Sequence, residues 1–113
     1  MTIRYKNQGF NLTDTSTTSV LTAPSDATVL IKQIQVSNGS SGSVNCNVQV
    51  TDTSATATFR IFNEGLNGAS TKDIISQTLV LEASDILKMT AGTANELQGI
   101  VSYALLDRSQ ENG

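Results

Sequence analysis

Histidine and tryptophan are absent from this 113-residue sequence, and cysteine and proline each occur once. Without histidine, the commonest general base and metal ligand, neither a Ser-His-Asp nor a Cys-His catalytic site can be built. The lone cysteine, Cys46, excludes a disulfide within the chain, and its place in an alternating segment predicts a buried structural thiol. We therefore expect no enzymatic activity and no bound cofactor.

Charged residues are also scarce, at 15% of the chain, and the net charge is −3. The lysines and arginines are spread along the sequence without a cluster, so the phosphate-neutralising surface of a nucleic-acid-binding protein is not expected. Apolar runs are short, residues 29–31 being an example, and none follows the first six residues. We expect no membrane span and no signal peptide, and we expect folding in the cytosol.

The strongest positive signal is alternation. From Val44 to Val50 every even position is apolar and every odd position is polar. A period of two predicts a β-strand whose valines and Cys46 face a core while its amide side chains face water. A helix would not separate the two sets of side chains in this way.

Shorter apolar or alternating segments predict the remaining strands, and residues 63–68 are predicted to form a polar loop. About six to eight short strands, with turn signals roughly every 8 to 12 residues, are typical of an all-β, antiparallel two-sheet β-sandwich, either jelly-roll-like or immunoglobulin-like. The lone proline, Pro24, falls in one of the turns. We place the sandwich domain at residues 20–106 and a flexible tail at residues 107–113.

Residues 1–19 combine apolar side chains with polar runs, and two interpretations are open. The segment is either an edge strand that completes the sandwich or an extended arm that reaches a neighbouring subunit. Its apolar side chains are the candidate subunit or particle contacts, together with one aromatic residue further along. These candidates are Ile3, Tyr5, Phe10, Leu12 and Phe62.

The sequence also offers few residues for two other kinds of site, a metal site and a sugar-binding face. Aspartates are present, but nearly all lie beside serine, threonine or glycine in predicted turns, where short carboxylates accept local backbone N–H groups. Calcium is the one metal worth naming, although no calcium-loop motif occurs. Sugar-binding faces generally use aromatic platforms, and here Tyr103 and Phe59 share parity with core positions, which leaves Tyr5, Phe10 and Phe62 as surface candidates.

Three segments carry a resemblance to a known group. They are residues 31–38 with the serine- and glycine-rich loop and strand that follow, residues 79–89 with a Leu-Glu-Ala-Ser-Asp turn, and residues 100–103 as a last strand. Together they resemble small β-sandwich structural proteins of tailed bacteriophage virions. The sequence departs from that pattern at Ser84, where glycine is usual, and at Met89, where a β-branched residue is usual. The resemblance implies no catalytic residue.

The hypothesis that follows is a bacteriophage virion protein, in first place a capsid decoration or cement protein that binds by shape complementarity. A neck, tail or fibre component is the alternative within the virion, and a carbohydrate-recognising adhesion module is the alternative of another class. The implied partners are major capsid or tail proteins and further copies of the chain, in a homo-oligomer for which a trimer is one candidate. The implied location is the virion, assembled in the host cytoplasm.

Overall fold

The computed structural model describes residues 2–107, and these residues form nine β-strands and no helix. In chain order the strands are β1 (Thr2–Leu12), β2 (Thr18–Thr22), β3 (Ala27–Asn38), β4 (Val44–Asp52), β5 (Ala57–Leu66), β6 (Ser70–Asp73), β7 (Leu79–Leu81), β8 (Ile86–Ala91) and β9 (Leu97–Asp107). Within this range no helix is long and apolar enough to cross a membrane.

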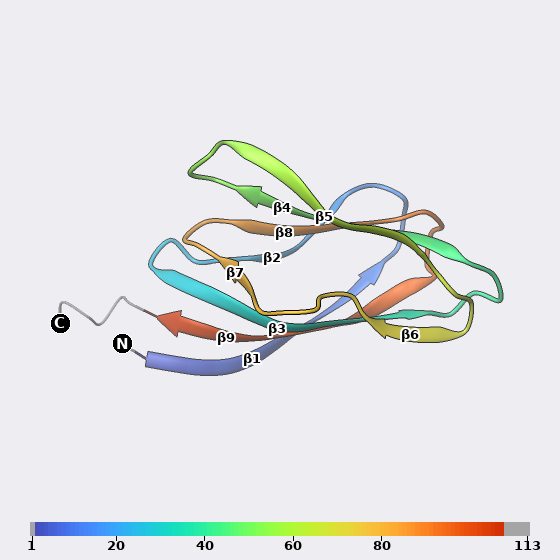
Figure 1. Cartoon of the computed structure of the whole chain (residues 1–113), viewed down its shortest axis with the longest axis horizontal. Coiled ribbons are helices and arrows are strands. Elements are labelled where there is room, and N and C mark those ends of the chain that lie inside the picture. The colour runs from blue at the N-terminus through green and yellow to red at the C-terminus, as the bar shows by residue number, and fades with distance from the viewer. Residues whose placement is uncertain (1, 108–113) are drawn as a thin grey trace.

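The strands form two antiparallel sheets that stack face to face (Figure 1). Sheet A has the order β1-β9-β3-β6, and β7 also pairs with β3; sheet B has the order β2-β8-β4-β5. The predicted all-β sandwich is therefore confirmed. The strand count is slightly above the expected range because β6 and β7, both short, pair with separate parts of β3.

The pairings are nested: β1 with β9, β2 with β8, β3 with β6 and β7, and β4 with β5. Nested antiparallel pairs describe one long ribbon whose tip is the β4–β5 turn. The additional pairs β3–β9 and β4–β8 roll this ribbon into two layers. A double-sheet arrangement of this kind is a jelly roll. The sequence left jelly-roll-like and immunoglobulin-like topologies open, and the strand order selects the first.

The core lies between the sheets and is built by strand alternation. On β4, Val44, Cys46, Val48 and Val50 are all buried, which confirms the predicted parity of this strand. On β3 a bulge between Ile31 and Gln33 shifts the register by one residue. The inserted residue lets side chains on both halves of β3 face inward, which strict alternation would not allow. The buried residues of β3 are Ala27, Val29, Ile31, Ile34, Val36 and Asn38.

Two predictions at the edge of sheet B were wrong. Residues 63–66 are not a loop but the end of β5, because pairing with β4 carries the strand on to the buried Leu66 despite its polar composition. Phe59 has the parity of a core residue and lies opposite Val50, yet it is 54% exposed. It lies near the hairpin end of β5, an edge strand that has only one neighbour. The prediction that Tyr103 is buried is confirmed.

The N-terminal segment belongs to both sheets. Residues 2–12, for which an edge strand and an extended arm were both open, form β1 and pair along their whole length with β9 of the same chain. Residues 18–22 form β2 at the edge of sheet B. At the other end β9 continues through Asp107, so this residue is part of the sandwich, and the rest of the predicted tail, 108–113, lies outside the described residues.

Candidate assembly surface

A row of apolar side chains lies on the outer face of sheet A, the face that points away from sheet B. Alternation assigns the residues of β3, β7 and β9 to this face because their neighbours in sequence face the core. Ile3 and Tyr5 share the face because they pair with Leu106 and Ala104 of β9. Cross-strand register places them in two adjacent rows, at the end of the sheet where β1 begins and β9 ends (Figure 1). The members of this apolar patch are Ile3, Tyr5, Leu30, Val80, Ala104 and Leu106.

Several patch side chains are open to solvent. Tyr5 is 81% exposed, Ile3 57% and Val80 50%. Ala104, although it points outward, is only 3% exposed and lies in the sheet between Tyr5 of β1 and Leu30 of β3. The patch is therefore contiguous across β1, β9, β3 and β7. Scattered apolar side chains are normal on a protein surface, whereas a contiguous patch is a candidate interaction site.

The structure separates the five sequence-predicted contact residues. Ile3 and Tyr5 lie together in the apolar patch. Leu12 is only 1% exposed and Phe10 packs against the core, because both have the inward parity of β1. Neither forms part of the apolar patch, and Leu12 is not available to a partner in this fold. Phe62 faces inward beneath Lys72, whose ammonium lies 5.6 Å from the ring centroid.

Sequence reasoning missed the remainder of the patch. The signal was present, because each missed residue is the outward member of a run that is apolar at every position, as in residues 29–31, 79–81 and 104–106. A strand of a two-layer sandwich with one wetted face should alternate. A run without alternation indicates that the outer face also has an apolar environment. Once β3, β7 and β9 are neighbours in one sheet, the three runs form one surface.

Three carboxyl groups, from Asp52, Glu82 and Asp85, come within 4.8 Å of one another where the β4–β5 and β7–β8 turns meet. Two of these carboxyl groups accept hydrogen bonds from the turn residues around them. Asp85 accepts the backbone N–H groups of Thr53 and Glu82 at 3.0 Å each. Asp52 accepts the Ser54 hydroxyl and the Ala55 N–H, and these bonds lower the pKa of its carboxyl. The predicted role of both aspartates in turn formation is confirmed.

Cys46 is fully buried at the centre of sheet B. Burial raises the pKa of its thiol to about 11, because the charged thiolate would lose its water. The thiol is therefore protonated near neutral pH and out of reach of a partner, as the sequence predicted.

Several solved structures of other proteins share this fold. A chain of the acid-stable capsid of Helicobacter pylori bacteriophage KHP30 aligns with a TM-score of 0.59 at 10% identity, over 96% of this chain and 90% of that one. A Bacillus endospore appendage protein, from a family of disulfide-linked pili, aligns with a TM-score of 0.58 at 10% identity, over 96% and 90%.

A chain of infectious bursal disease virus aligns with a TM-score of 0.58 at 9% identity, over 96% of this chain but only 33% of that one. No protein-family model and no curated protein matches the sequence. At these identities the likeness shows the fold and nothing further. The fold is one that viral capsids and a bacterial appendage also use.

Proposed function

We propose that this chain is a structural protein of a bacteriophage particle, and that it decorates the capsid by docking the apolar patch of sheet A onto the shell. The observation that carries this proposal is the exposed, contiguous patch on one sheet of a jelly roll. The structural likeness to a phage capsid chain supports it, and so does the resemblance of three sequence segments to virion proteins. We also propose that the domain has no catalytic role, since two of the three carboxyl groups that come together, those of Asp52 and Asp85, accept hydrogen bonds within the turns.

A disulfide-linked appendage is less well supported for this domain. A link of that kind needs an accessible thiol on each subunit. The chain has one cysteine, and Cys46 is buried in the core of the folded domain. Non-covalent packing of apolar surface is the mode of assembly that the described residues provide for.

The decisive experiment measures binding of the purified chain to capsids of the phage whose genome encodes it, by co-sedimentation. In the patch variant, Tyr5→Lys and Val80→Lys place two charges in the apolar patch. The matched control, Thr58→Lys with Asn63→Lys, places the same two charges on exposed positions of the outer face of sheet B. Both variants should keep a cooperative thermal transition, because none of the four positions is buried.

We expect the patch variant to lose at least about tenfold in capsid affinity, which corresponds to about 1.4 kcal/mol, while the control binds as the parent does. Equal binding by both variants would show that the particle contact lies elsewhere. Sedimentation of the chain alone, in the same series, tests whether the patch also holds a homo-oligomer and whether that oligomer is a trimer.

A further inference from the structure

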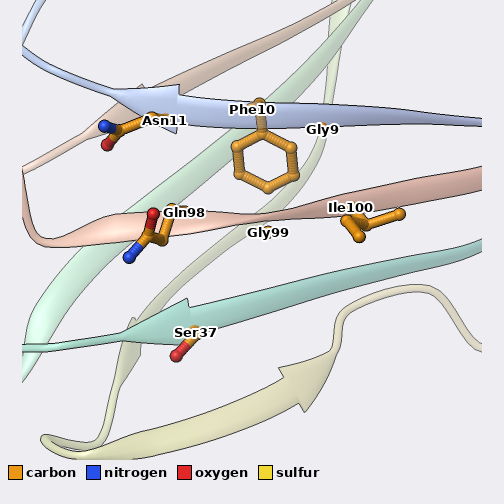
Figure 2. Close-up of a pocket in the computed structure, with 7 residues that line it drawn as sticks. All are labelled: Gly9, Phe10, Asn11, Ser37, Gln98, Gly99 and Ile100. Atoms are coloured by element: carbon orange, nitrogen blue, oxygen red, sulfur yellow. The ribbon is translucent and has the colours of Figure 1, made fainter.

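A shallow hollow lies on the same outer face of sheet A, at the end away from the apolar patch. Figure 2 shows the residues that line it. The hollow has a volume of about 640 Å³ and is lined by β1, β9 and β3. One row of the sheet, centred on Ser102, separates the hollow from the patch.

Two glycines line the hollow, and the one on β1 leaves it open. A Cβ atom on Gly9 would have no neighbour closer than the Gly99 carbonyl oxygen at 3.9 Å, so the space above Gly9 is empty. A Cβ atom on Gly99 would overlap the carbonyl oxygen of Gln35 and lie 3.0 Å from Cζ of Phe10. The Phe10 ring points from β1 toward Gly99 on β9 (Figure 2). Because these residues belong to paired strands, the hollow is part of the sheet and not of a loop.

Three neutral polar side chains form one row along the hollow. Asn11 of β1 lies opposite Gln98 of β9, and Gln98 lies opposite Ser37 of β3. Within residues 2–107 none of these three side chains makes a hydrogen bond, so their donors and acceptors are available to a ligand. Ile100, 46% exposed, adds apolar surface beside the row, whereas the Phe10 ring packs against the core.

The chemistry of the hollow selects its ligand. None of the lining residues is ionisable, so a charged ligand would find no counter-charge. Amides and a hydroxyl both donate and accept, which suits a ligand that carries many hydroxyl groups. An apolar surface beside them suits the C–H face of a sugar ring. We propose that the hollow binds a neutral oligosaccharide, a function that goes beyond assembly of the particle.

The experiment is a titration of the ¹⁵N-labelled chain with neutral hexasaccharides of glucose, of xylose and of N-acetylglucosamine, followed by NMR. We expect at least one of them to shift the backbone amides of Gly9 and Ile100 and the side-chain amides of Asn11 and Gln98. Because the site is shallow, the dissociation constant should be on the order of 1 mM. A charged galacturonate hexasaccharide should produce no such shifts.

The blocking variant is Gly9→Leu, which fills the hollow from a position where a side chain has room and the backbone is unstrained. It should fold as the parent does and lose binding by tenfold or more. Gln98→Ala should weaken binding at least threefold, whereas Asn63→Ala, which removes an amide from the opposite outer face, should leave it unchanged.

Absence of shifts with all three neutral sugars would overturn the proposal, and so would binding that survives Gly9→Leu. Equal shifts with the galacturonate oligomer would overturn the assignment to a neutral ligand. Capsid binding serves as an independent measurement. Gly9→Leu should retain it because the filled hollow lies outside the apolar patch, so failure of the sugar site and failure of the assembly proposal are distinguishable.

Discussion

The outer faces of the two sheets differ in how their side chains are satisfied. On sheet B, neighbouring strands join polar groups: the Oγ1 atoms of Thr51 and Thr58 lie 2.9 Å apart, and Asn45 donates to Asn63 at 2.9 Å. On sheet A, the same positions of the pleat hold the apolar patch and, beyond it, polar side chains without partners in the described chain. The outer face of sheet B is thus mainly polar, with Asn47 Oδ1 buried there without a hydrogen-bond partner, whereas the outer face of sheet A exposes a row of apolar side chains.

The difference arises from which strands alternate. β4 separates polar from apolar side chains fully, so the face it contributes to sheet B is wetted. β3 and β9, the central strands of sheet A, carry apolar residues at both parities in part of their length. Burial in the core explains only one of these parities. The experiments below test this difference between the two sheets. They change the inner face of β4, the strand spacing of sheet A and the β7–β8 turn, and they are ordered from the largest to the smallest expected effect on stability.

The largest effect is expected from a charge on the inner face of β4. Cys46→Asp places an unpaired carboxylate in the core and should cost about 3 to 5 kcal/mol of unfolding free energy. Gln49→Asp, on the outer face of the same strand, should change it by no more than about 0.5 kcal/mol, because Lys88 and Arg60 lie opposite. Denaturant titration measures both. Similar losses for the two variants would mean that the faces of sheet B are less distinct than burial indicates.

Sheet A is expected to be most sensitive at Gly99. Gly99→Ala would drive a methyl group into the Gln35 carbonyl oxygen and against Phe10, and it should cost about 3 kcal/mol or more. Gly9→Ala is the matched control one strand away, where a Cβ atom has room, and it should change stability by less than about 1 kcal/mol. Thermal unfolding of the two variants would separate them by many degrees. A mild effect at Gly99 would contradict the close approach of β9 to β3.

The pH dependence of stability tests the inner face without altering the outer one. The folded-state pKa of Cys46 is raised from 9.0 to about 11, so folding favours the protonated thiol. This contribution is fully present below the unfolded-state pKa and is lost as the pH rises through the folded-state value. Between about pH 9 and 11 the parent should therefore lose up to about 2 to 3 kcal/mol more than Cys46→Val, which has no thiol. Parallel denaturation curves for the two proteins across that range would contradict the burial of the thiol.

The sequence predicted features that depend on alternation within one strand. It did not predict features that depend on which strands are neighbours in a sheet. The buried set of β4 followed from its period of two, and the turn aspartates followed from their neighbours. The apolar patch did not follow, because Ile3, Leu30 and Val80 become neighbours only when β1, β9, β3 and β7 are placed in one sheet. The hollow depends in addition on the pairing of Gly9 with Ile100 and of Asn11 with Gln98 across β1 and β9, and this register cannot be read from the local sequence.

One departure from the virion-protein pattern gains a physical account. Ser84 stands where glycine is usual, and its φ is 69°, in the left-handed region that disfavours residues with a Cβ atom. Its N–H donates to the Ala23 carbonyl, and its own carbonyl accepts from Thr53. Both are backbone groups of Ser84, so a glycine would keep these bonds and relieve the strain.

The smallest effect is expected at the turn that Ser84 occupies, which joins β7 of sheet A to β8 of sheet B and belongs to neither outer face. Ser84→Gly should stabilise the fold by about 0.5 to 1 kcal/mol, a rise of roughly 2 to 6 °C in Tm. Asn95→Gly, at a φ of 66°, should gain less, because asparagine tolerates this conformation. Calorimetry gives the stability and co-sedimentation gives the assembly. Since Ser84→Gly leaves the apolar patch intact, it should raise Tm without changing capsid binding. A change in both would show that assembly depends on the stability of the whole sandwich, and the contrast between the two outer faces would then not be its cause.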